Sequence, residues 1–242
     1  MLQTVIRRRT VNARGLRLSL QYDNRITRYR WHSCSVKEPE TLDWIDQQMG
    51  AQDILFDVGA NIGIFSIYAA FRHPRLRVVA LEPEYANLHL LRDNLIANRL
   101  HDRVEVYSVA LGNRNGISQL HIQDFTPGAA LHTESPTSLQ ITKTNQPVIG
   151  KEGIYALTLD AFCEQTGLVP NCLKIDVDGT EAEILEGAAS TLRSSALRSL
   201  LVEMFGGPEV RRSCERLLSA AGLSRQWGDP SLGANEIWGR TA

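Results

Sequence analysis

The stretch Asp53-Ile-Leu-Phe-Asp57-Val-Gly59-Ala-Asn-Ile-Gly63-Ile-Phe-Ser66 decides the fold of this chain. A hydrophobic run leads into two glycines, and an apolar helical pattern follows them. Glycines let the backbone turn tightly and let a ligand approach the main chain. The start of the following helix offers free N–H groups to a polar ligand. The stretch therefore predicts a strand, a glycine turn and a helix that together face a ligand.

The spacing within this turn, and the carboxylate in front of it, indicate which ligand binds. A dinucleotide fingerprint reads G-x-G-x-x-G and places a pyrophosphate on the helix start. Here three residues separate Gly59 from Gly63, and Asp57 stands at the strand end. A carboxylate at that position would repel a pyrophosphate but suits a ligand with an ammonium and a sulfonium. S-adenosylmethionine carries both groups and no phosphate, so Asp57, Gly59, Asn61 and Gly63 are predicted to bind it.

A second carboxylate supports a nucleoside ligand. The next apolar run ends in Leu81-Glu82-Pro83, which places Glu82 19 residues after Gly63. In βαβ nucleotide sites an acidic residue about 20 residues after the glycine turn meets the ribose hydroxyls. A carboxylate accepts two hydroxyl hydrogen bonds at once. Glu82 is therefore predicted to hold the ribose.

The rest of the chain alternates short apolar runs with helical patterns. This alternation predicts an α/β fold, a Rossmann-like sheet of seven mostly parallel strands with helices on both faces. Residues 1–52 are expected to form an N-terminal extension, in which the strand 16–22 pairs with 28–32 and a short helix follows Pro39. Residues 53–242 are expected to form the cofactor domain. The alternation fails over 123–153, a loop rich in Pro, Gly, Ser and Thr. Loops of this length are often lids or substrate loops, and His132 is the histidine in it that we would test.

Composition excludes several classes of protein. The 242 residues are 43% hydrophobic and 22% charged, with a formal net charge of -1. These values are close to those of an average globular protein and predict no nucleic-acid partner. No apolar segment is long enough to span a bilayer. The four cysteines form no metal-binding pattern and are expected to be free thiols. A cytoplasmic protein is the simplest expectation, and a homo-oligomer is compatible with it.

Together these motifs resemble the FkbM family of class I S-adenosylmethionine-dependent methyltransferases. The resemblance covers roughly residues 53 to 205 and rests on segments in family order: Asp57-Val-Gly-Ala-Asn-Ile-Gly63, Glu82-Pro83, Val109-Ala-Leu-Gly112, Thr158-Leu-Asp160, Lys174-Ile-Asp-Val-Asp-Gly179 and Val202-Glu203. The family usually has Glu at the position of Asp178 and Ala at that of Thr180. The resemblance implies methyl transfer from S-adenosylmethionine to a hydroxyl of a small molecule, such as a sugar or natural product. It also implies that the adenine packs near Ser108, after the third strand.

The segment Lys174-Ile-Asp176-Val-Asp178 carries the predicted chemistry. Period two places its three charges on one side of an apolar strand, which is costly unless they are paired or functional. A hydroxyl acceptor must lose its proton to a base within hydrogen-bond reach. Asp176 is the first candidate for that base and Glu203 the second, with Lys174 as the ion-pair partner of Asp176. Binding of the cofactor's amino group by Asp176 stays an equal alternative.

Other interpretations stay open at this point. Asp176, Asp178, Glu181 and Glu203 would suit a divalent cation if they clustered, but the sequence predicts no metal. A nicotinamide-dependent oxidoreductase has a similar sheet, although Asp57 and the missing G-x-G-x-x-G argue against it. A non-catalytic methyltransferase-like binding protein need not keep this set of charges.

Overall fold

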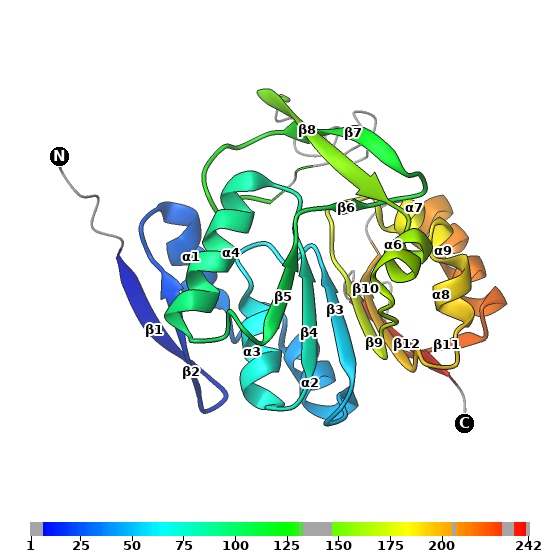
Figure 1. Ribbon diagram of the computed structural model, residues 1–242, viewed down its shortest axis with the longest axis horizontal. Helices are drawn as coiled ribbons and strands as arrows, with labels where there is room; N and C mark the ends of the chain where they lie inside the picture. Colours follow the sequence, from blue (N-terminus) through cyan, green and yellow to red (C-terminus); the bar gives the residue numbers. More distant parts are fainter. Residues whose placement is uncertain (1–6, 131, 133–146, 205–206, 229–234, 241–242) are drawn as a thin grey trace.

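The computed structural model describes residues 7–130, 132, 147–204, 207–228 and 235–240. Its centre is a seven-stranded sheet with the strand order β11-β12-β10-β9-β3-β4-β5 (Figure 1). Five neighbouring strands run parallel: β3 (Ile54–Val58), β4 (Arg77–Leu81), β5 (Val104–Tyr107), β9 (Cys172–Ile175) and β10 (Ser199–Glu203). β12 (Asn235–Arg240) is antiparallel to both β10 and β11 (Leu223–Trp227). The predicted seven-stranded, mostly parallel sheet is confirmed.

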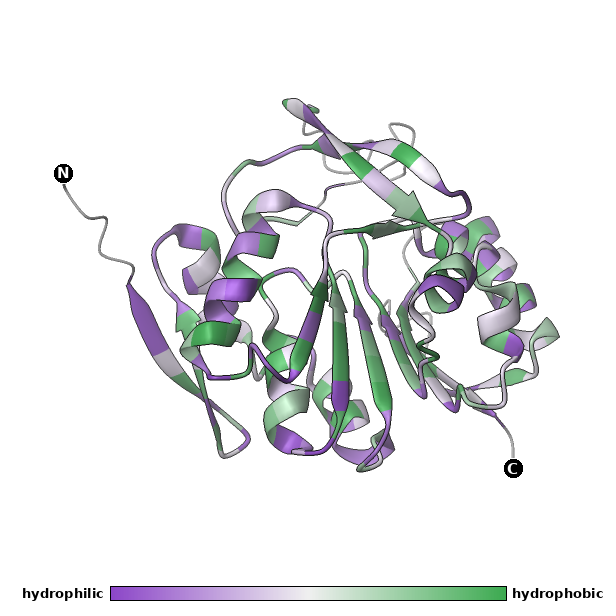
Figure 2. Cartoon of the chain, in the orientation of Figure 1, coloured by the Kyte–Doolittle hydropathy of each residue, from purple (hydrophilic) through white to green (hydrophobic). Residues whose placement is uncertain are grey.

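Helices cover both faces of this sheet, because its strands are apolar on both sides. On β3, Phe56 and Val58 belong to one buried cluster and Leu55 belongs to the other. Figure 2 shows the apolar strands at the centre of the molecule. The first cluster is closed by α6 (Leu159–Thr166), α7 (Glu181–Glu186), α8 (Ala189–Arg193) and α9 (Pro208–Ala220). The second is closed by α2 (Pro39–Gln48), α3 (Ile64–Arg72) and α4 (Tyr85–Ala97).

The N-terminal hairpin differs from the one that we predicted. β2 (Leu16–Gln21) pairs with β1 (Arg8–Ala13), and residues 28–32 belong to the helix α1 (Arg25–Ser33). The turn between the strands is Arg14-Gly15, and both residues have positive φ, as a type I′ hairpin requires. Asn24 then caps α1, because its side chain accepts the N–H groups of Ile26 and Thr27. The Arg14-Gly15 turn and the Asn24 cap thus decide the local structure. The predicted pairing of the strand 16–22 with residues 28–32 is wrong.

Residues of the N-terminal segment pack into the same core as the sheet. Trp44 of α2 is buried and donates its indole N–H to Ser199 Oγ at 2.8 Å. On the edge of β2 that faces away from β1, the side chain of Asn98 accepts the Ser19 N–H and donates to the Ser19 carbonyl. Asn94 accepts the N–H of Gln21 in the same way. Side chains of α4 thus satisfy the edge of the hairpin, while the domain boundary at residue 52 stays a prediction.

A small three-stranded sheet adjoins the carboxyl ends of the main strands (Figure 1). It has the order β6-β8-β7 and consists of β6 (Ala110–Leu111), β7 (Gly116–Ile122) and β8 (Gly150–Leu157). The predicted loop 123–153 is therefore too long at its C-terminal end, since β8 begins at Gly150. Two glycines in β8, Gly150 and Gly153, weakened the strand signal there. Residues 131 and 133–146 of that loop lie outside the described residues.

Candidate functional site

A cavity lies at the carboxyl ends of β3 and β9, the point where the strand order reverses. From β3 the chain continues to β4 on one side, and from β9 it continues to β10 on the other. Open α/β sheets bind their ligands at such a switch point. Six of the residues predicted from the sequence line this cavity: Gly59, Asn61, Glu82, Lys174, Asp176 and Glu203.

The glycine turn is pressed against the end of β9. Gly59 has a φ of 77°, and a Cβ atom there would lie 1.9 Å from the Asp176 carbonyl oxygen. Only glycine fits such a close approach in this backbone conformation. Asn61 also has positive φ, and its side chain donates to the Ala129 carbonyl at 2.8 Å. The turn thereby brings the start of α3 and the end of β9 to one cavity wall.

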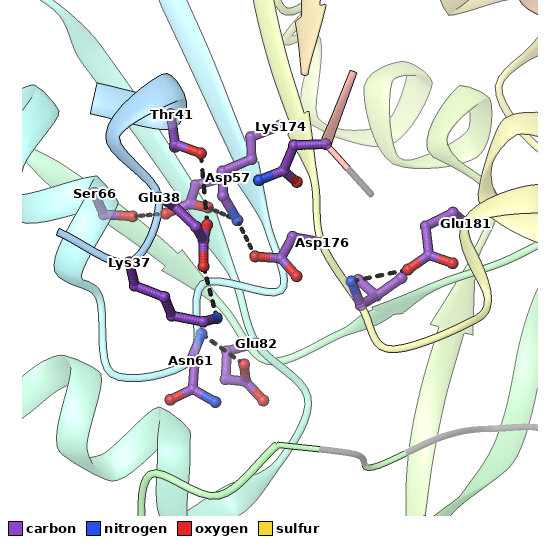
Figure 3. Close-up of polar contacts among 12 residues, drawn as sticks. Lys37, Glu38, Thr41, Asp57, Asn61, Ser66, Glu82, Lys174, Asp176 and Glu181 are labelled. Atoms are coloured by element: carbon purple, nitrogen blue, oxygen red, sulfur yellow. Dashed lines mark hydrogen bonds and ion pairs between the residues drawn. The ribbon is translucent and has the colours of Figure 1, made fainter. Parts of the chain in front are cut away.

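Glu82 is held by the main chain at the end of β4. One of its carboxylate oxygens accepts the Asn61 N–H at 2.8 Å (Figure 3). The other accepts the Glu84 N–H at 2.9 Å. Burial raises the pKa of Glu82 to about 7, although both N–H groups favour its charged form. Each carboxylate oxygen has a second lone pair. Glu82 can therefore accept two more hydrogen bonds from a diol in the cavity.

A chain of charges leads from the cavity wall into the buried core (Figure 3). The Lys174 ammonium lies 2.9 Å from Asp176 Oδ2 and 3.5 Å from Asp57 Oδ1. Asp57 Oδ2 also accepts the Ser66 hydroxyl at 2.6 Å. Burial alone would lower the pKa of Lys174, but the carboxylates of Asp176 and Asp57 raise it above its ordinary value. Lys174 is thus an ammonium that positions Asp176, and it cannot serve as a base.

Asp176 and Glu203 are hydrogen-bonded carboxyl groups at the ends of neighbouring strands. Burial would raise the pKa of Asp176, but Lys174 and a hydrogen bond with Glu203 hold it below its usual range. Burial and the Asp176 charge raise the pKa of Glu203 well above its usual range. Close carboxylates behave in this way because both cannot be ionised together. Glu203 therefore holds the proton at neutral pH, and Asp176 is the carboxylate.

Three residues that the sequence predicts for cofactor binding do not line the cavity. Asp57 is fully buried beneath it, with its oxygens directed to Ser66 and Lys174. Gly63 is buried at the start of α3, where it contacts Leu91. Ser108 is exposed after β5. Direct contact of these three residues with a cofactor stays a prediction.

The N-terminal segment supplies cavity residues that the sequence analysis missed. The cavity is also lined by Arg30, at the end of α1, and by Lys37 and Glu38, just before α2. Lys37 and Glu38 form an ion pair at 2.7 Å. No motif marks these residues, because only chain folding brings them to the sheet. His132 also lines the cavity, and burial lowers its pKa.

The carboxylates near the site do not form a metal centre in the described part of the chain. Glu181 is buried and accepts the Gly179 N–H at 3.0 Å. Among the described residues, no three His, Cys, Asp or Glu side chains are arranged to hold a metal ion. The same residues contain no helix long and apolar enough to cross a membrane.

This strand order, with one antiparallel strand and a cavity at the switch point, defines the class I methyltransferase fold. A solved structure of a putative rRNA-methylase from Clostridium thermocellum shares the fold, with a TM-score of 0.52 at 9% identity over 84% of this chain and 95% of that one. The model of the methyltransferase FkbM domain matches residues 57–220. The chain belongs to the FkbM methyltransferase family.

Two curated relatives show how far this similarity extends. The 31-O-demethyl-FK506 methyltransferase FkbM of Streptomyces tacrolimicus is 28% identical over 56% of this chain, which spans 59% of that relative's length. The hexuronic acid methyltransferase AglP of Haloferax volcanii is 27% identical over 78% of this chain and 71% of the relative. Family and fold agree with the resemblance that the motifs indicate.

Proposed function

We propose that this protein is an S-adenosylmethionine-dependent methyltransferase that methylates a hydroxyl of a small molecule. One observation carries the proposal: an acidic cavity at the switch point, with Glu82 and Asp176 at the ends of β4 and β9. Family membership supports methyl transfer over the nicotinamide-dependent alternative. A cytoplasmic location and a homo-oligomer stay predictions.

The chemistry of the cavity wall suits this cofactor. Glu82 has free lone pairs for the two ribose hydroxyls. Asp176 is a carboxylate that suits an ammonium or the positive charge near a sulfonium. No phosphate-binding set of the G-x-G-x-x-G type is present at the turn. When bound, S-adenosylmethionine supplies a methyl group that is already activated, so the protein's task is largely positioning.

We assign the proton of the acceptor hydroxyl to Asp176. The acceptor oxygen bonds to the methyl carbon as the carbon–sulfur bond breaks, and its proton passes to the Asp176 carboxylate. An oxygen that gains a methyl cation becomes far more acidic than a carboxylic acid, so a carboxylate of lowered pKa is basic enough. Lys174 and Glu203 hold Asp176 in place and ionised.

The names of the relatives support a hydroxylated small molecule as the acceptor. One is named for methylation of a compound that lacks a methyl group on an oxygen, and another for a hexuronic acid. A sugar or natural product with a free hydroxyl is the acceptor class that we propose.

Calorimetry with S-adenosylhomocysteine and with NADH tests the cofactor. We expect saturable binding of S-adenosylhomocysteine, and binding of NADH alone would overturn the proposal. Mass spectrometry of a panel of hydroxylated acceptors then tests transfer. Asp176→Asn is expected to lose turnover even at saturating cofactor, whereas Glu203→Gln, which keeps a neutral hydrogen-bond donor, is the matched control. Normal turnover in Asp176→Asn would remove this residue as the base.

A further inference from the structure

Arg30 is a partly buried cation at the cavity wall that the proposed chemistry does not use. It lies in the last turn of α1 and donates its Nε–H to the Gly128 carbonyl at 2.6 Å. That carbonyl is itself fixed, because the Gly128 N–H donates to Asn87 Oδ1 at 2.8 Å and the Pro127 carbonyl accepts from Asn24. The guanidinium therefore has a set orientation at the cavity.

Arg30 differs from the other long cations of the cavity. Lys37 pairs with Glu38 at 2.7 Å, and Lys174 pairs with Asp176 at 2.9 Å. Arg30 has no carboxylate within 4 Å among the residues that the structure describes. Burial lowers its pKa, and the more distant Asp178 and Asp176 offset this only in part. Its two terminal nitrogens have no hydrogen-bond partner in the described part of the chain.

A guanidinium placed in this way is suited to a carboxylate. Its planar fork donates two parallel hydrogen bonds to two oxygens, which a point charge such as lysine does not do. A partly buried, unpaired charge costs free energy that an anionic partner recovers. The ligand group opposite Arg30 should therefore be an anion with paired oxygens.

The start of α3 is a second element of the cavity that suits an anion, such as the carboxylate of the cofactor. No side chain caps α3 at Gly63, so the N–H groups of its first turn lack partners within the helix. Ile64 and Phe65 of that turn line the cavity. A helix start favours an anion through both its N–H groups and its dipole. Two anion-binding elements are thus present, and the cofactor has one carboxylate.

From these contacts we infer that Arg30 is a specificity-determining residue that binds a carboxylate of the acceptor molecule. This inference rests on the proposed function. It narrows the acceptor to hydroxylated molecules that also carry a carboxylate, such as hydroxy acids and acidic sugars. The carboxylate of the cofactor is the other source of the same chemistry, and the experiment separates the two.

Calorimetry with matched probes tests the inference. The probes are D-glucuronate against D-glucose and 4-hydroxybenzoate against 4-hydroxybenzamide, each measured with and without S-adenosylhomocysteine. We expect at least one carboxylate to bind the wild type about tenfold to hundredfold more tightly than its neutral partner. Arg30→Gln should remove that difference and leave the affinity for S-adenosylhomocysteine unchanged. Arg28→Gln is the matched control, because Arg28 is exposed on the same helix and lies over the Tyr22 ring.

Other results would overturn the inference. It falls if no carboxylate binds more tightly than its neutral partner. It also falls if Arg30→Gln weakens S-adenosylhomocysteine instead, because the guanidinium then serves the cofactor. Arg30→Lys, which keeps the charge but not the fork, checks the result if Arg30→Gln unfolds. A wild type that binds no S-adenosylhomocysteine contradicts the proposed function separately, and the carboxylate pairs still test Arg30.

Discussion

Replacing Lys174 by methionine tests the chain of charges that leads from the cavity wall into the core. Its ammonium lies 2.9 Å from Asp176 and 3.5 Å from Asp57, and only 2% of its side chain is exposed. Methionine has a similar length and no charge. Lys174→Met therefore leaves Asp57, whose side chain is 1% exposed, without its counter-charge. The cavity should keep its shape, because the side chain keeps its length, while the positive charge of Lys174 is lost.

The expected loss of stability follows from this burial. Breaking a buried ion pair by removing one partner costs about 3–5 kcal/mol, because the other charge stays buried and unpaired. Loss of the Lys174–Asp176 pair should not add the same cost again, since the Asp176 side chain is 26% exposed and water can reach it. We therefore expect Lys174→Met to lose about 3–5 kcal/mol of unfolding free energy at pH 7. The total unfolding free energy of a natural domain is roughly 5–15 kcal/mol, so this loss is a large part of it.

The loss should depend on pH. In the wild type, the pKa of Lys174 is raised, so its stabilisation is fully present below its ordinary value and stays constant between pH 5 and 8. In the variant, the cation that lowers the pKa of Asp176 is gone, and this pKa should rise. The folded variant then binds more protons than the unfolded chain as the pH falls. The loss of unfolding free energy in Lys174→Met, relative to the wild type, should therefore be smaller at pH 5 than at pH 8.

Urea denaturation at pH 5, 7 and 8 measures both effects. Lys37→Met is the matched control, because its ion pair with Glu38 joins an ammonium that is 53% exposed. Such pairs contribute about 0–1 kcal/mol. A loss below about 1 kcal/mol in Lys174→Met, or a loss that is equal at all three pH values, would refute the reasoning.

Three further predictions concern the turn, the ribose site and the proton on Glu203. Gly59→Ala should cost clearly more stability than Gly167→Ala, measured by urea denaturation. Both have positive φ, which costs about 1–2 kcal/mol, but only Gly59 meets backbone within 4 Å. Affinity for S-adenosylhomocysteine should fall as the pH drops below about 7, where Glu82 takes up a proton, and calorimetry of Glu82→Gln should lose this dependence. Glu203→Gln should leave the unfolding free energy at pH 7 within about 1 kcal/mol of the wild-type value, because a protonated Glu203 resembles glutamine. A loss as large as that of Lys174→Met would mean that Glu203 is negatively charged in the wild type.

Local patterns in the sequence were sufficient to predict the first half of the site. The run into Gly59, the helix after Gly63 and the carboxylate Glu82 are close in sequence, and a βαβ unit brings them together in one known way. The alternation of Lys174 and Asp176 likewise predicted that both side chains lie on the same side, and they form an ion pair at the end of β9. Such signals work because a strand or turn constrains its own residues.

Other features required contacts between distant residues. Asp57 was expected to face the ligand, but it lies inside the core, where it accepts the Ser66 hydroxyl and faces the Lys174 ammonium. Arg30 lies in a helix that gave no functional signal, and it reaches the cavity because the N-terminal segment packs against α4 and the Gly128 carbonyl. The pairing of β1 with β2 was missed although Arg14-Gly15 marks its turn.

The sequence by itself determined the fold class, the family and the glycine turn with its two flanking carboxylates. These are properties of short segments, and backbone sterics and side-chain period fix them locally. Only the tertiary structure decided which charged side chains form ion pairs with one another and which face the cavity. Burial and the distance between charges set their pairing and protonation, and both arise when strands and loops far apart in the chain meet. Asp57 is therefore buried in the core, whereas Arg30 lines the cavity.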